Sequence, residues 1–349
     1  MTCSICKEKN KIEIKKNNFF LRTDSKDKKI NDYKNYVCFN CGNIYQRPKI
    51  PKKKLIEYYD NNYRKTDSQI LIDKKTLDLP LKFEWTGVSF QRFNAFFEIL
   101  KKYRKLKLKK NDLIFDYGCY QGAFLYACRE TYGVRVLGTD YNRNGLDLAN
   151  KFFNIKTIQT SDSLFNKKIN AKIVTLLHVF EHLDDPVGFL IKIKRNILSK
   201  NGFIYLEIPN PFCNPLDDPT HLNLYSERTI KYLLESSGYD VCFFEKKSIY
   251  KSYNYLRDNK NLNIHVLAKV NNKNKTKFRK INIGPNIYSK FIKERNKSLI
   301  NMMTRKVRSL FFNFLHTTYT LFLFIINIFN SNLSVNVHKF LKGFLKKNN

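Results

Sequence analysis

The run Asp116-Tyr117-Gly118-Cys119-Tyr120-Gln121-Gly122 follows an apolar segment and precedes a stretch of helical period. Gly118 permits a tight turn and close approach of the backbone to a ligand, and Gly122 opens the following helix. Asp140 ends the next apolar segment, 24 positions beyond Asp116, where a carboxylate can accept hydrogen bonds from both hydroxyls of a ribose. A glycine loop followed by an acid at this spacing predicts a nucleoside-type cofactor at the edge of a parallel sheet.

Around this loop, apolar runs rich in β-branched and aromatic residues alternate with stretches of helical period. The expected strands are Leu113–Tyr117, Arg135–Asp140, Lys156–Thr160, Ile173–Val179, Phe203–Ile208, Val241–Glu245 and Ile264–Val270. The expected helices are Ala123–Tyr132, Asn144–Phe153, Val187–Leu198 and Glu227–Ser237. This alternation is typical of a doubly wound α/β sheet, in which ligands bind at the carboxyl ends of the strands. No helix separates the last two strands, so we expect the seventh strand to be antiparallel.

Four cysteines form two C-x-x-C pairs near the amino terminus, Cys3 with Cys6 and Cys38 with Cys41. This spacing lets two thiolates of one tight turn bind a tetrahedral Zn²⁺. Four sulfurs leave no coordination position for water, so the predicted zinc is structural and stabilises a segment that lacks a core of its own. The long loop between the pairs leaves room for a hairpin around 19–21. The other thiols, which lie singly in apolar runs, are expected to be buried small hydrophobes: Cys119, Cys128, Cys213 and Cys242.

The charge of the chain is unevenly distributed. Its 349 residues carry 64 Lys and Arg against 30 Asp and Glu, a formal net charge of +34. Residues 1–111 hold 28 basic and 12 acidic residues and residues 251–349 hold 20 and 2, whereas residues 112–250 hold 16 of each. A hydrophobic content of 43% excludes a disordered chain, and the composition excludes collagen, a coiled coil and a disulfide scaffold. The middle is therefore a neutral globular domain between two basic flanks.

The chain is expected to divide into four parts: a zinc ribbon (1–50), a helical linker and lid (51–111), the α/β domain (112–270) and a basic, hydrophobic helical tail (271–349). Its amino terminus has no apolar stretch of signal-peptide length, so a reducing cytoplasm is the expected location.

The tail contains an uncharged stretch at 309–338, and both of its flanks are basic. Polar side chains interrupt its apolar run, which favours a helix or helical hairpin lying on the anionic inner face of the cell membrane over one that crosses it. The alternative is a helix packed on the α/β domain or on a second copy of the chain.

Several motifs together resemble class I S-adenosylmethionine-dependent methyltransferases. The resemblance rests on DYGCYQG at 116–122, Asp140, Ser161-Asp162-Ser163, HVFEHLDDP at 178–186 and Asn201-Gly202-Phe203. The stretch CFNCGNIYQRP at 38–48, leading to Tyr58-Tyr59 and Tyr63, is similar to a zinc-bearing subgroup associated with sugar and surface-glycan methylation. So is HLNLYS at 221–226, leading to Ser237-Gly238-Tyr239. The resemblance covers residues 1–270 and does not extend to the tail.

Carried over to this chain, the resemblance implies the positions of the cofactor. It implies that Asp116 and Gly118 line the methionine end, that Asp140 holds the ribose and that Asp162 faces the adenine amine. The expected cofactor site is completed by Tyr117, Gly122, Tyr141 and His178. Tyr120 replaces a glycine of the family pattern, so either its side chain turns away from the cofactor or the loop binds the cofactor loosely.

Histidines are the candidate bases, because transfer of a methyl group to a hydroxyl or carbon acid requires a group that takes its proton. His178, Glu181 and His182 cluster at the end of the fourth strand, and His221 lies on the loop after the fifth. We expect His221 or His182 to act directly and Glu181 to orient them. The same four side chains could instead bind a divalent ion that activates a substrate hydroxyl. A zinc protease of the H-x-x-E-H type is disfavoured, because the motif straddles a strand end rather than one helical face.

The sequence thus predicts a methyltransferase that acts on a small molecule or glycan, such as a sugar or nucleotide-sugar of surface polysaccharide biosynthesis. Nucleic acid is a less expected substrate, because a neutral domain attracts a polyanion weakly. Two alternatives remain open: an RNA methyltransferase that grips RNA with the ribbon and basic flanks, and an adaptor without catalytic activity. Hydride transfer ranks below methyl transfer, because Tyr120 would crowd the approach of a dinucleotide pyrophosphate.

Overall fold

The computed structural model describes residues 2–14, 33–59, 84–212, 220–247, 262–273 and 278–293. Met1–Phe291 form one compact unit and Ile292–Asn349 a second. The compact unit therefore extends twenty residues beyond the expected start of the tail at 271. The uncharged stretch 309–338 and the expected hairpin at 19–21 lie outside the described residues.

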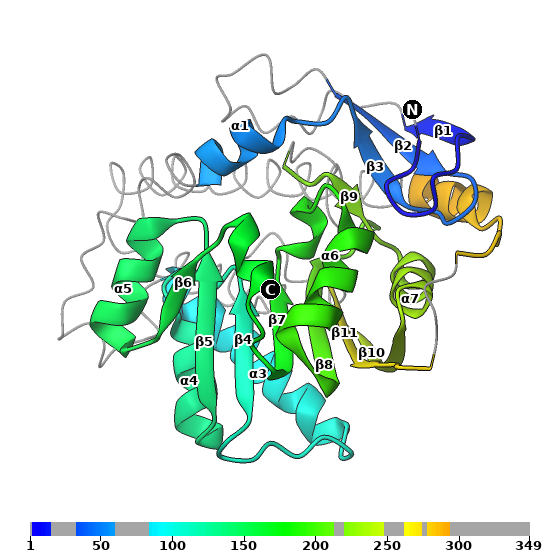
Figure 1. The fold of residues 1–349 in the computed structure, drawn as a ribbon. Helices are drawn as coiled ribbons and strands as arrows, with labels where there is room; N and C mark the ends of the chain where they lie inside the picture. The colour runs from blue at the N-terminus through cyan, green and yellow to red at the C-terminus, as the bar shows by residue number, and fades with distance from the viewer. Residues whose placement is uncertain are drawn as a thin grey trace, which may run out of the picture. The chain divides into compact units, whose positions relative to one another are not determined.

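A seven-stranded sheet with the order β10-β11-β8-β7-β4-β5-β6 forms the centre of the compact unit (Figure 1). Its strands are β4 (Leu113–Tyr117), β5 (Arg135–Asp140), β6 (Thr157–Gln159), β7 (Ala171–Leu177), β8 (Leu198–Pro209), β10 (Tyr239–Lys247) and β11 (Asn263–Val270). Strands β4 to β8 are parallel, and β11 pairs antiparallel with both β8 and β10. The doubly wound sheet and its antiparallel seventh strand are thus confirmed.

Helices cover both faces of this sheet. They are α3 (Glu84–Lys102), α4 (Ala123–Tyr132), α5 (Arg143–Phe153), α6 (Pro186–Lys192) and α7 (Glu227–Ser236), with the short α1 (Lys52–Glu57) before them. Alternate residues of β7 reach opposite layers: Ile173 packs in the cluster that includes residues of α3, α4 and α5, and Val174 in the cluster that includes residues of α6 and α7. The period of two along a strand explains why β7 is apolar throughout.

Several expected boundaries differ from those of the structure, and two of the differences lie near the end of β7 or the start of β8. The helix expected at 187–198 is α6 followed by a π-helical turn, η7 (Ile193–Ile197), and β8 already starts at Leu198. Strand β7 ends at Leu177, so His178 is the first residue beyond the strand rather than part of it.

The amino-terminal segment forms a second, four-stranded sheet, which we call the ribbon sheet. Its order is β1-β2-β3-β9, with β1 (Lys11–Ile14), β2 (Lys34–Cys38), β3 (Ile44–Arg47) and β9 (Asn223–Leu224). Strand β9 comes from the chain between β8 and α7, so the ribbon sheet is continuous with the large domain rather than a detached module.

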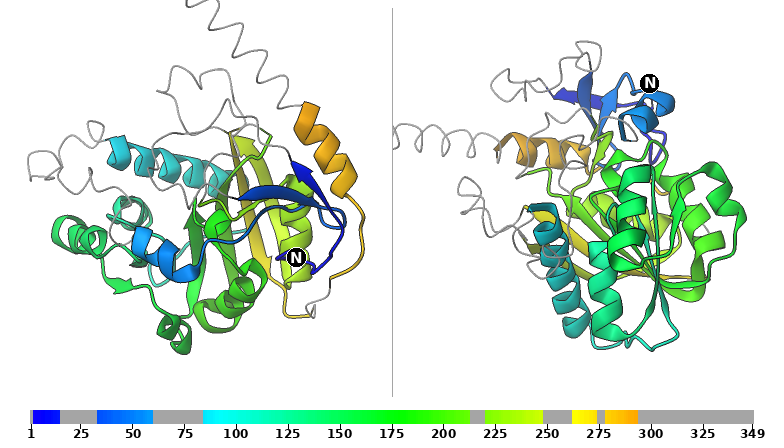
Figure 2. Two further views of the ribbon diagram at one scale, coloured as in Figure 1. Left: turned by 90° about the horizontal axis from the view of Figure 1, so that it is seen from above. Right: turned by 90° about the vertical axis from the view of Figure 1, so that its left-hand side faces the viewer.

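A helix at 284–293 lies beside the ribbon strands (Figure 2). The N–H groups of Ile283 and Gly284 donate to the carbonyls of Asn40 and Phe39, at 2.9 and 2.8 Å. This contact explains why the compact unit extends to Phe291. No helix among the described residues is long and apolar enough to cross a membrane.

Three of the four single thiols can be placed. Cys119 and Cys128 are buried, as expected. Cys242 is only half-buried, so its expected burial was wrong: β10 is the edge strand of the sheet and has a neighbour on one side only. Cys213 lies outside the described residues.

Candidate functional site

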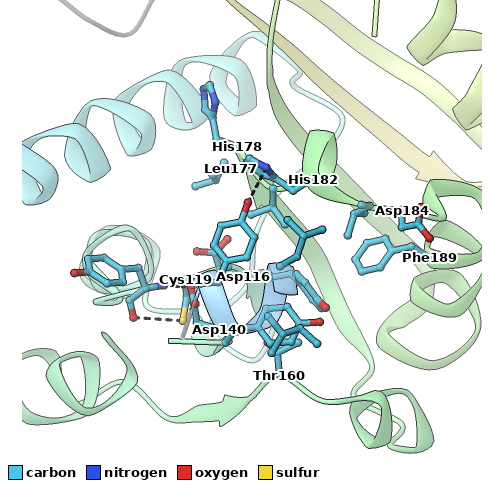
Figure 3. A pocket seen from close by; sticks show the side chains of 18 of the residues that line it. Asp116, Cys119, Asp140, Thr160, Leu177, His178, His182, Asp184 and Phe189 are labelled. Carbon is cyan, nitrogen blue, oxygen red and sulfur yellow. Dashed lines mark hydrogen bonds between the residues drawn. The ribbon is translucent and has the colours of Figure 1, made fainter. Parts of the chain in front are cut away.

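A cavity of about 350 Å³ lies at the carboxyl ends of β4, β5 and β7. Asp140 and Thr160 lie at one end of it and His178 and His182 at the other (Figure 3). Eight of the expected site residues line it, namely Asp116, Tyr117, Gly118, Asp140, Tyr141, Asp162, His178 and His182. Gly122, Glu181 and His221 lie outside its lining.

The glycines of the loop after β4 are required by backbone geometry. Gly118 has a φ of +88°, and a β-carbon there would collide with the side chain of Val179. Gly122 precedes α4 with a φ of +74°, and its β-carbon would lie 2.9 Å from that of Ala149. Only glycine adopts these angles without strain. Gly122 therefore shapes the loop without facing the cavity.

Tyr120 adopts a left-handed conformation, with a φ of 44°. A β-carbon added to Gly145, in α5, would lie 2.6 Å from Cδ2 of the Tyr120 ring. The ring thus packs on the first turn of α5, where the absence of a side chain makes room for it. The backbone N–H of Tyr120 donates to Oδ2 of Asp140 at 2.8 Å.

Two aspartates lie at the end of the cavity that we call the cofactor end, because the sequence predicts the cofactor there. Oδ1 of Asp140 also accepts from the N–H of Asn142, at 2.9 Å, so the carboxylate is held by one backbone donor on each oxygen. Asp116 is fully buried and accepts from Oγ1 of Thr175 at 2.6 Å. Burial raises the pKa of Asp116 to about 7, despite the opposing effects of this hydrogen bond and of the Arg92 charge.

Helix α1 and the residues after it reach both ends of the cavity. Nζ of Lys52 lies 2.9 Å from Oδ1 of Asp162, and this ion pair lowers the pKa of Asp162. Seven residues further on, the hydroxyl of Tyr59 lies 2.8 Å from Nδ1 of His182. The carbonyl of Tyr59 accepts from Nδ2 of Asn142 at 3.2 Å. Contacts at its two ends thus hold the segment 52–59 against the cavity.

His178 bridges two buried carboxylates. Its Nδ1 lies 3.2 Å from Oε1 of Glu181 and its Nε2 lies 3.3 Å from Oε1 of Glu207, and neither glutamate is exposed. Nε of Arg92 donates to the same oxygen of Glu207 at 3.2 Å. His178 has a φ of 56°, a strained conformation of the kind that concentrates at functional sites.

Burial alone would raise the pKa values of both glutamates. For Glu181, the contact with His178 and the charges of His182 and His221 outweigh burial and lower the pKa to about 2. For Glu207, Arg92 and His178 do the same, and its pKa also falls to about 2. Neighbouring basic groups thus compensate the buried negative charge at this end of the cavity, which we call the acceptor end because the sequence predicts the catalytic histidines there.

His182 and His221 form a pair beside this cluster, with ring centroids 4.9 Å apart. Nδ1 of His182 lies 2.9 Å from the carbonyl oxygen of Thr220. A carbonyl can only accept, so this contact places a proton on Nδ1 and leaves Nε2 as the basic nitrogen of the neutral ring. Ligand atoms of Glu181, His182 and His221 also lie within 4.8 Å of one another, a set of types that suits a divalent transition metal.

The four amino-terminal cysteines converge. The sulfurs of Cys3 and Cys41 are 3.6 Å apart and those of Cys6 and Cys38 are 3.5 Å apart. All four lie within 4.8 Å of one another, and only Cys6 is partly exposed. With Zn–S bonds of about 2.3 Å, a tetrahedral ion holds its sulfurs about 3.8 Å apart. The arrangement therefore fits a closed four-thiolate site.

Residues 90–242 match the sequence family described as a methyltransferase domain. The chain thus contains a methyltransferase domain. Its methyl donor is S-adenosylmethionine, in accord with a sheet order and a loop after β4 that present a cofactor cavity at the strand ends. A search of curated protein sequences returned no match.

Solved structures similar to this methyltransferase include S-adenosylmethionine-dependent methyltransferases of Archaeoglobus fulgidus and Aquifex aeolicus. The first is 21% identical, with 51% of this chain and 94% of that chain covered and a TM-score of 0.39. The second is 17% identical, with 59% and 97% covered and a TM-score of 0.39. The plantazolicin methyltransferase BpumL in complex with SAH is 16% identical, with 62% and 94% covered and a TM-score of 0.42.

Three residues of the site had no role assigned from the sequence. Tyr59 was part of a noted motif, but only the folded lid brings it to His182. Arg92 lies on a helix expected to be a linker, yet it lines the cavity. Glu207 interrupts the apolar strand β8, and a charge inside a buried strand is the signal that could have identified it.

Proposed function

We propose that this methyltransferase acts on a small molecule or glycan, specifically a sugar or nucleotide-sugar of surface polysaccharide biosynthesis, with a histidine as base. The observation that carries the proposal is the His182 and His221 pair, of which His182 lines the acceptor end of the cavity and has the hydroxyl of Tyr59 on its ring. A hydroxyl or carbon acid loses a proton when it takes a methyl group, and an imidazole near neutral pH is suited to accept it.

His221 and His182 are the proposed base and its partner, and Glu181 orients them. Because Nδ1 of His182 faces the carbonyl of Thr220, proton transfer would use Nε2. Glu181 is a fully buried carboxylate with an oxygen within 4.8 Å of a ring nitrogen of each histidine, which suits it to hold their orientation. His178 is a poor candidate for the base, since both of its nitrogens face carboxylates.

The charge of the cavity supports a small acceptor over RNA. Five aspartates line it, Asp116, Asp140, Asp162, Asp184 and Asp185, against three basic side chains, Lys52, Arg92 and Lys192. An acidic lining opposes the docking of a polyanion across the opening, whatever the basic flanks contribute.

The test is transfer of labelled methyl from S-adenosylmethionine to a panel of nucleotide-sugars and oligosaccharides, with total RNA as the competing substrate. We expect label on a sugar compound and none on RNA. Label on RNA, together with retention that falls steeply with salt, would replace the proposal with the RNA methyltransferase. Absence of S-adenosylmethionine binding in calorimetry would indicate the adaptor.

The paired histidines allow one variant of this mechanism, in which Glu181, His182 and His221 hold a divalent ion that binds the acceptor hydroxyl. Activity that is lost on chelation and restored by one metal, at unchanged zinc content of the four-cysteine site, would favour this variant. Activity that is insensitive to chelation leaves the histidine base as the mechanism.

We propose that the four cysteines bind one structural zinc ion. The distances between their sulfurs support this, and the closed shell assigns the metal to folding rather than to the chemical step. Metal analysis should give one zinc per chain, and Cys38→Ser should lose it. The matched control is Cys128→Ser, a buried thiol outside the cluster, which should retain full metal content.

We propose that the basic and hydrophobic tail attaches the protein to an anionic membrane surface. The sequence supports this with an uncharged stretch at 309–338 between basic flanks. The full chain should float with anionic vesicles at moderate salt, and a chain that ends after Phe291, the boundary of the compact unit, should not. If both stay in the soluble fraction, the proposal is wrong.

A further inference from the structure

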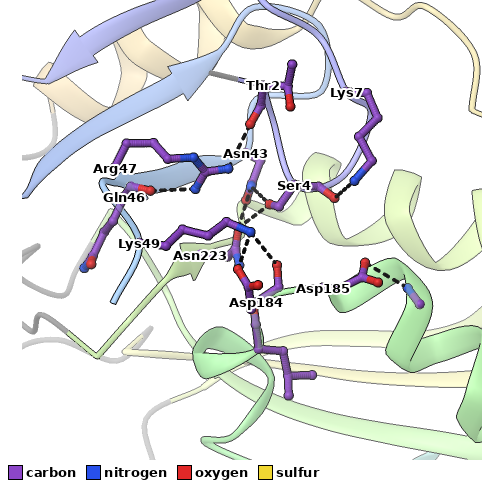
Figure 4. A network of polar contacts seen from close by, with 12 residues as sticks. Thr2, Ser4, Lys7, Asn43, Gln46, Arg47, Lys49, Asp184, Asp185 and Asn223 are labelled. Atoms are coloured by element: carbon purple, nitrogen blue, oxygen red, sulfur yellow. Dashed lines mark hydrogen bonds and ion pairs between the residues drawn. The ribbon is translucent and has the colours of Figure 1, made fainter. Parts of the chain in front are cut away.

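The buried side chain of Asn223 joins the cysteine module to residues on both sides of the histidine pair (Figure 4). By cysteine module we mean the two C-x-x-C turns together with strands β1 to β3. Oδ1 of Asn223 accepts from Oγ of Ser4 at 2.6 Å and from Nδ2 of Asn43 at 2.8 Å. Its Nδ2 donates to the carbonyl of Leu183 at 2.7 Å. Asn223 is 2% exposed, so these hydrogen bonds do not compete with bulk water.

The partners of Asn223 occupy informative positions in the chain. Ser4 lies between Cys3 and Cys6, and Asn43 follows Cys41 by two residues. Each C-x-x-C turn therefore contributes one donor to the same amide oxygen. Nδ2 of Asn43 also donates to Oγ of Ser4 at 3.1 Å. The two side chains that donate to Asn223 are therefore hydrogen-bonded to each other as well.

On the other side, the contacts end beside the proposed catalytic residues. Leu183 directly follows His182, and Asn223 stands two residues after His221. Backbone pairing strengthens this junction: Tyr45 and Ile44 of β3 are opposite Asn223 and Leu224. The N–H of Gln46 donates to the carbonyl of Leu222 at 3.2 Å. The loop that carries His221 is thus an extension of the ribbon sheet.

The same loop sets the orientation of His182, because the carbonyl of Thr220 contacts its Nδ1. A displacement of residues 220–223 would therefore move the His221 ring and remove a hydrogen-bond partner of His182 at once. The amide of Asn223 restrains this displacement relative to Leu183, and the two cysteine turns restrain the amide.

We propose that Asn223 is a positioning residue through which the folded cysteine module fixes the His182 and His221 pair. This inference rests on the proposed function, in which that pair does the chemistry. It makes the ribbon an integral part of the acceptor site, rather than a separate module that grips another macromolecule.

A contact between the same two parts of the chain provides a matched control. Lys49 forms an ion pair with Asp184, but these side chains are 36% and 52% exposed. Exposed ion pairs contribute little to structure, whereas buried amide hydrogen bonds leave costly unsatisfied groups when one partner is removed. Lys49→Ala should therefore not move the histidine pair, although it lies at the same junction.

The test uses the full zinc-loaded chain and the ring signals of its histidines in ¹H–¹³C NMR, assigned by single histidine substitutions. Asn223→Ala should shift the ring signals of both His182 and His221, keep the zinc, and change affinity for S-adenosylmethionine by less than about twofold. The signal of His265, buried in β11, serves as an internal reference and should not move. Lys49→Ala should leave all of these signals unchanged.

Milder variants keep the proposal testable if Asn223→Ala does not fold. Ser4→Ala and Asn43→Ala each remove one donor to Oδ1 of Asn223 and leave its donor to Leu183 in place. Both should shift the same two signals in the same direction by a smaller amount. The proposal is overturned if folded, zinc-loaded variants leave both signals in place, or if they shift them together with His265 and lower cofactor affinity. No methyl acceptor enters this test, so its failure is distinct from failure of the sugar panel.

Discussion

The two ends of the cavity are built in different ways. At the cofactor end, Asp140 is held by the N–H groups of Tyr120 and Asn142, which lie within 20 residues of it, although Thr175 and Lys52 reach this end from further away in the sequence. The acceptor end combines Tyr59 of the lid, Arg92 of α3, Glu207 of β8 and the histidines of two separate loops. Local motifs can therefore specify the cofactor end, whereas only the folded chain assembles the acceptor end.

The two ends also differ in how buried charge is treated. Glu181 and Glu207 at the acceptor end are matched by His178 and Arg92, and their pKa values fall to about 2. Asp116 at the cofactor end has a neutral hydroxyl as its hydrogen-bond donor, and its pKa rises to about 7. S-adenosylmethionine carries a positive sulfonium and a positive ammonium group, which the carboxylates of the cofactor end can pair with. The buried carboxylates of the acceptor end already have basic partners within the protein.

The largest expected effect separates the two ends by function. His221→Ala and His182→Ala should each lower turnover on the identified acceptor by on the order of 10²-fold or more, because each removes a proposed general base or its partner. Affinity for S-adenosylmethionine should stay within about twofold, since neither ring contacts the carboxylates that define the cofactor end. Calorimetry and initial rates measure the two quantities. Near-normal turnover in both variants would return these histidines to a structural role.

The next effect concerns the glycine loop. Gly118→Ala should weaken S-adenosylmethionine binding by on the order of 10²-fold, since it adds left-handed strain and a collision with Val179. The matched control is Gly133→Ala, where φ is also positive, at +61°, but no atom lies within 4 Å of the added carbon. The control should lose stability in thermal denaturation and keep its affinity. Equal losses of affinity would show that strain alone, not the shape of the loop, explains the effect.

A smaller effect is expected at the ribose position. Asp140→Ala should lower affinity for S-adenosylmethionine at least about tenfold, because removal of a charge-assisted acceptor costs about 1.5 to 3 kcal/mol. Asp147→Ala, an exposed acid on the neighbouring helix α5, tests for a general effect of charge and should change nothing. Unchanged affinity in Asp140→Ala would remove this residue from the cofactor site.

The same contrast between the two ends of the cavity explains which parts of the site could be predicted from the sequence. Asp116, Gly118 and Asp140 come together because parallel strands end at one edge of a sheet, a rule that applies without knowledge of the side chains between them. Glu207 and Arg92 form an ion pair although they are 115 residues apart in the sequence, and no local sequence pattern predicts this contact. The π-turn η7 was likewise missed, because the apolar period of α6 continues through it. The packing of Gly284 on Phe39 depends on the folded shape of the cysteine turn, and no local pattern in the sequence predicts it.

The smallest expected effect is a pH dependence that arises at Asp116. Its pKa of about 7 lies above the ordinary 3.8, so this carboxyl is largely protonated below neutral pH. The positively charged cofactor favours the carboxylate, and affinity for S-adenosylmethionine should therefore fall by up to about tenfold for each pH unit below 7 and level off above pH 8.

The free energy of unfolding of the cofactor-free chain should change with pH in the opposite sense. A carboxyl whose pKa is raised by folding stabilises the fold most below pH 4, and this contribution is lost as pH rises through 7. The charges that face Asp116 are those of Arg92, Asp140 and Glu207, and the pKa of Glu207 is lowered to about 2, outside this range. Calorimetric titrations from pH 5.5 to 8.5 measure the affinity, with Asp116→Asn as the matched variant. Asp116→Asn should bind weakly at every pH without the slope; a slope that persists in this variant would assign the titration to another group and remove the contrast in buried charge between the two ends.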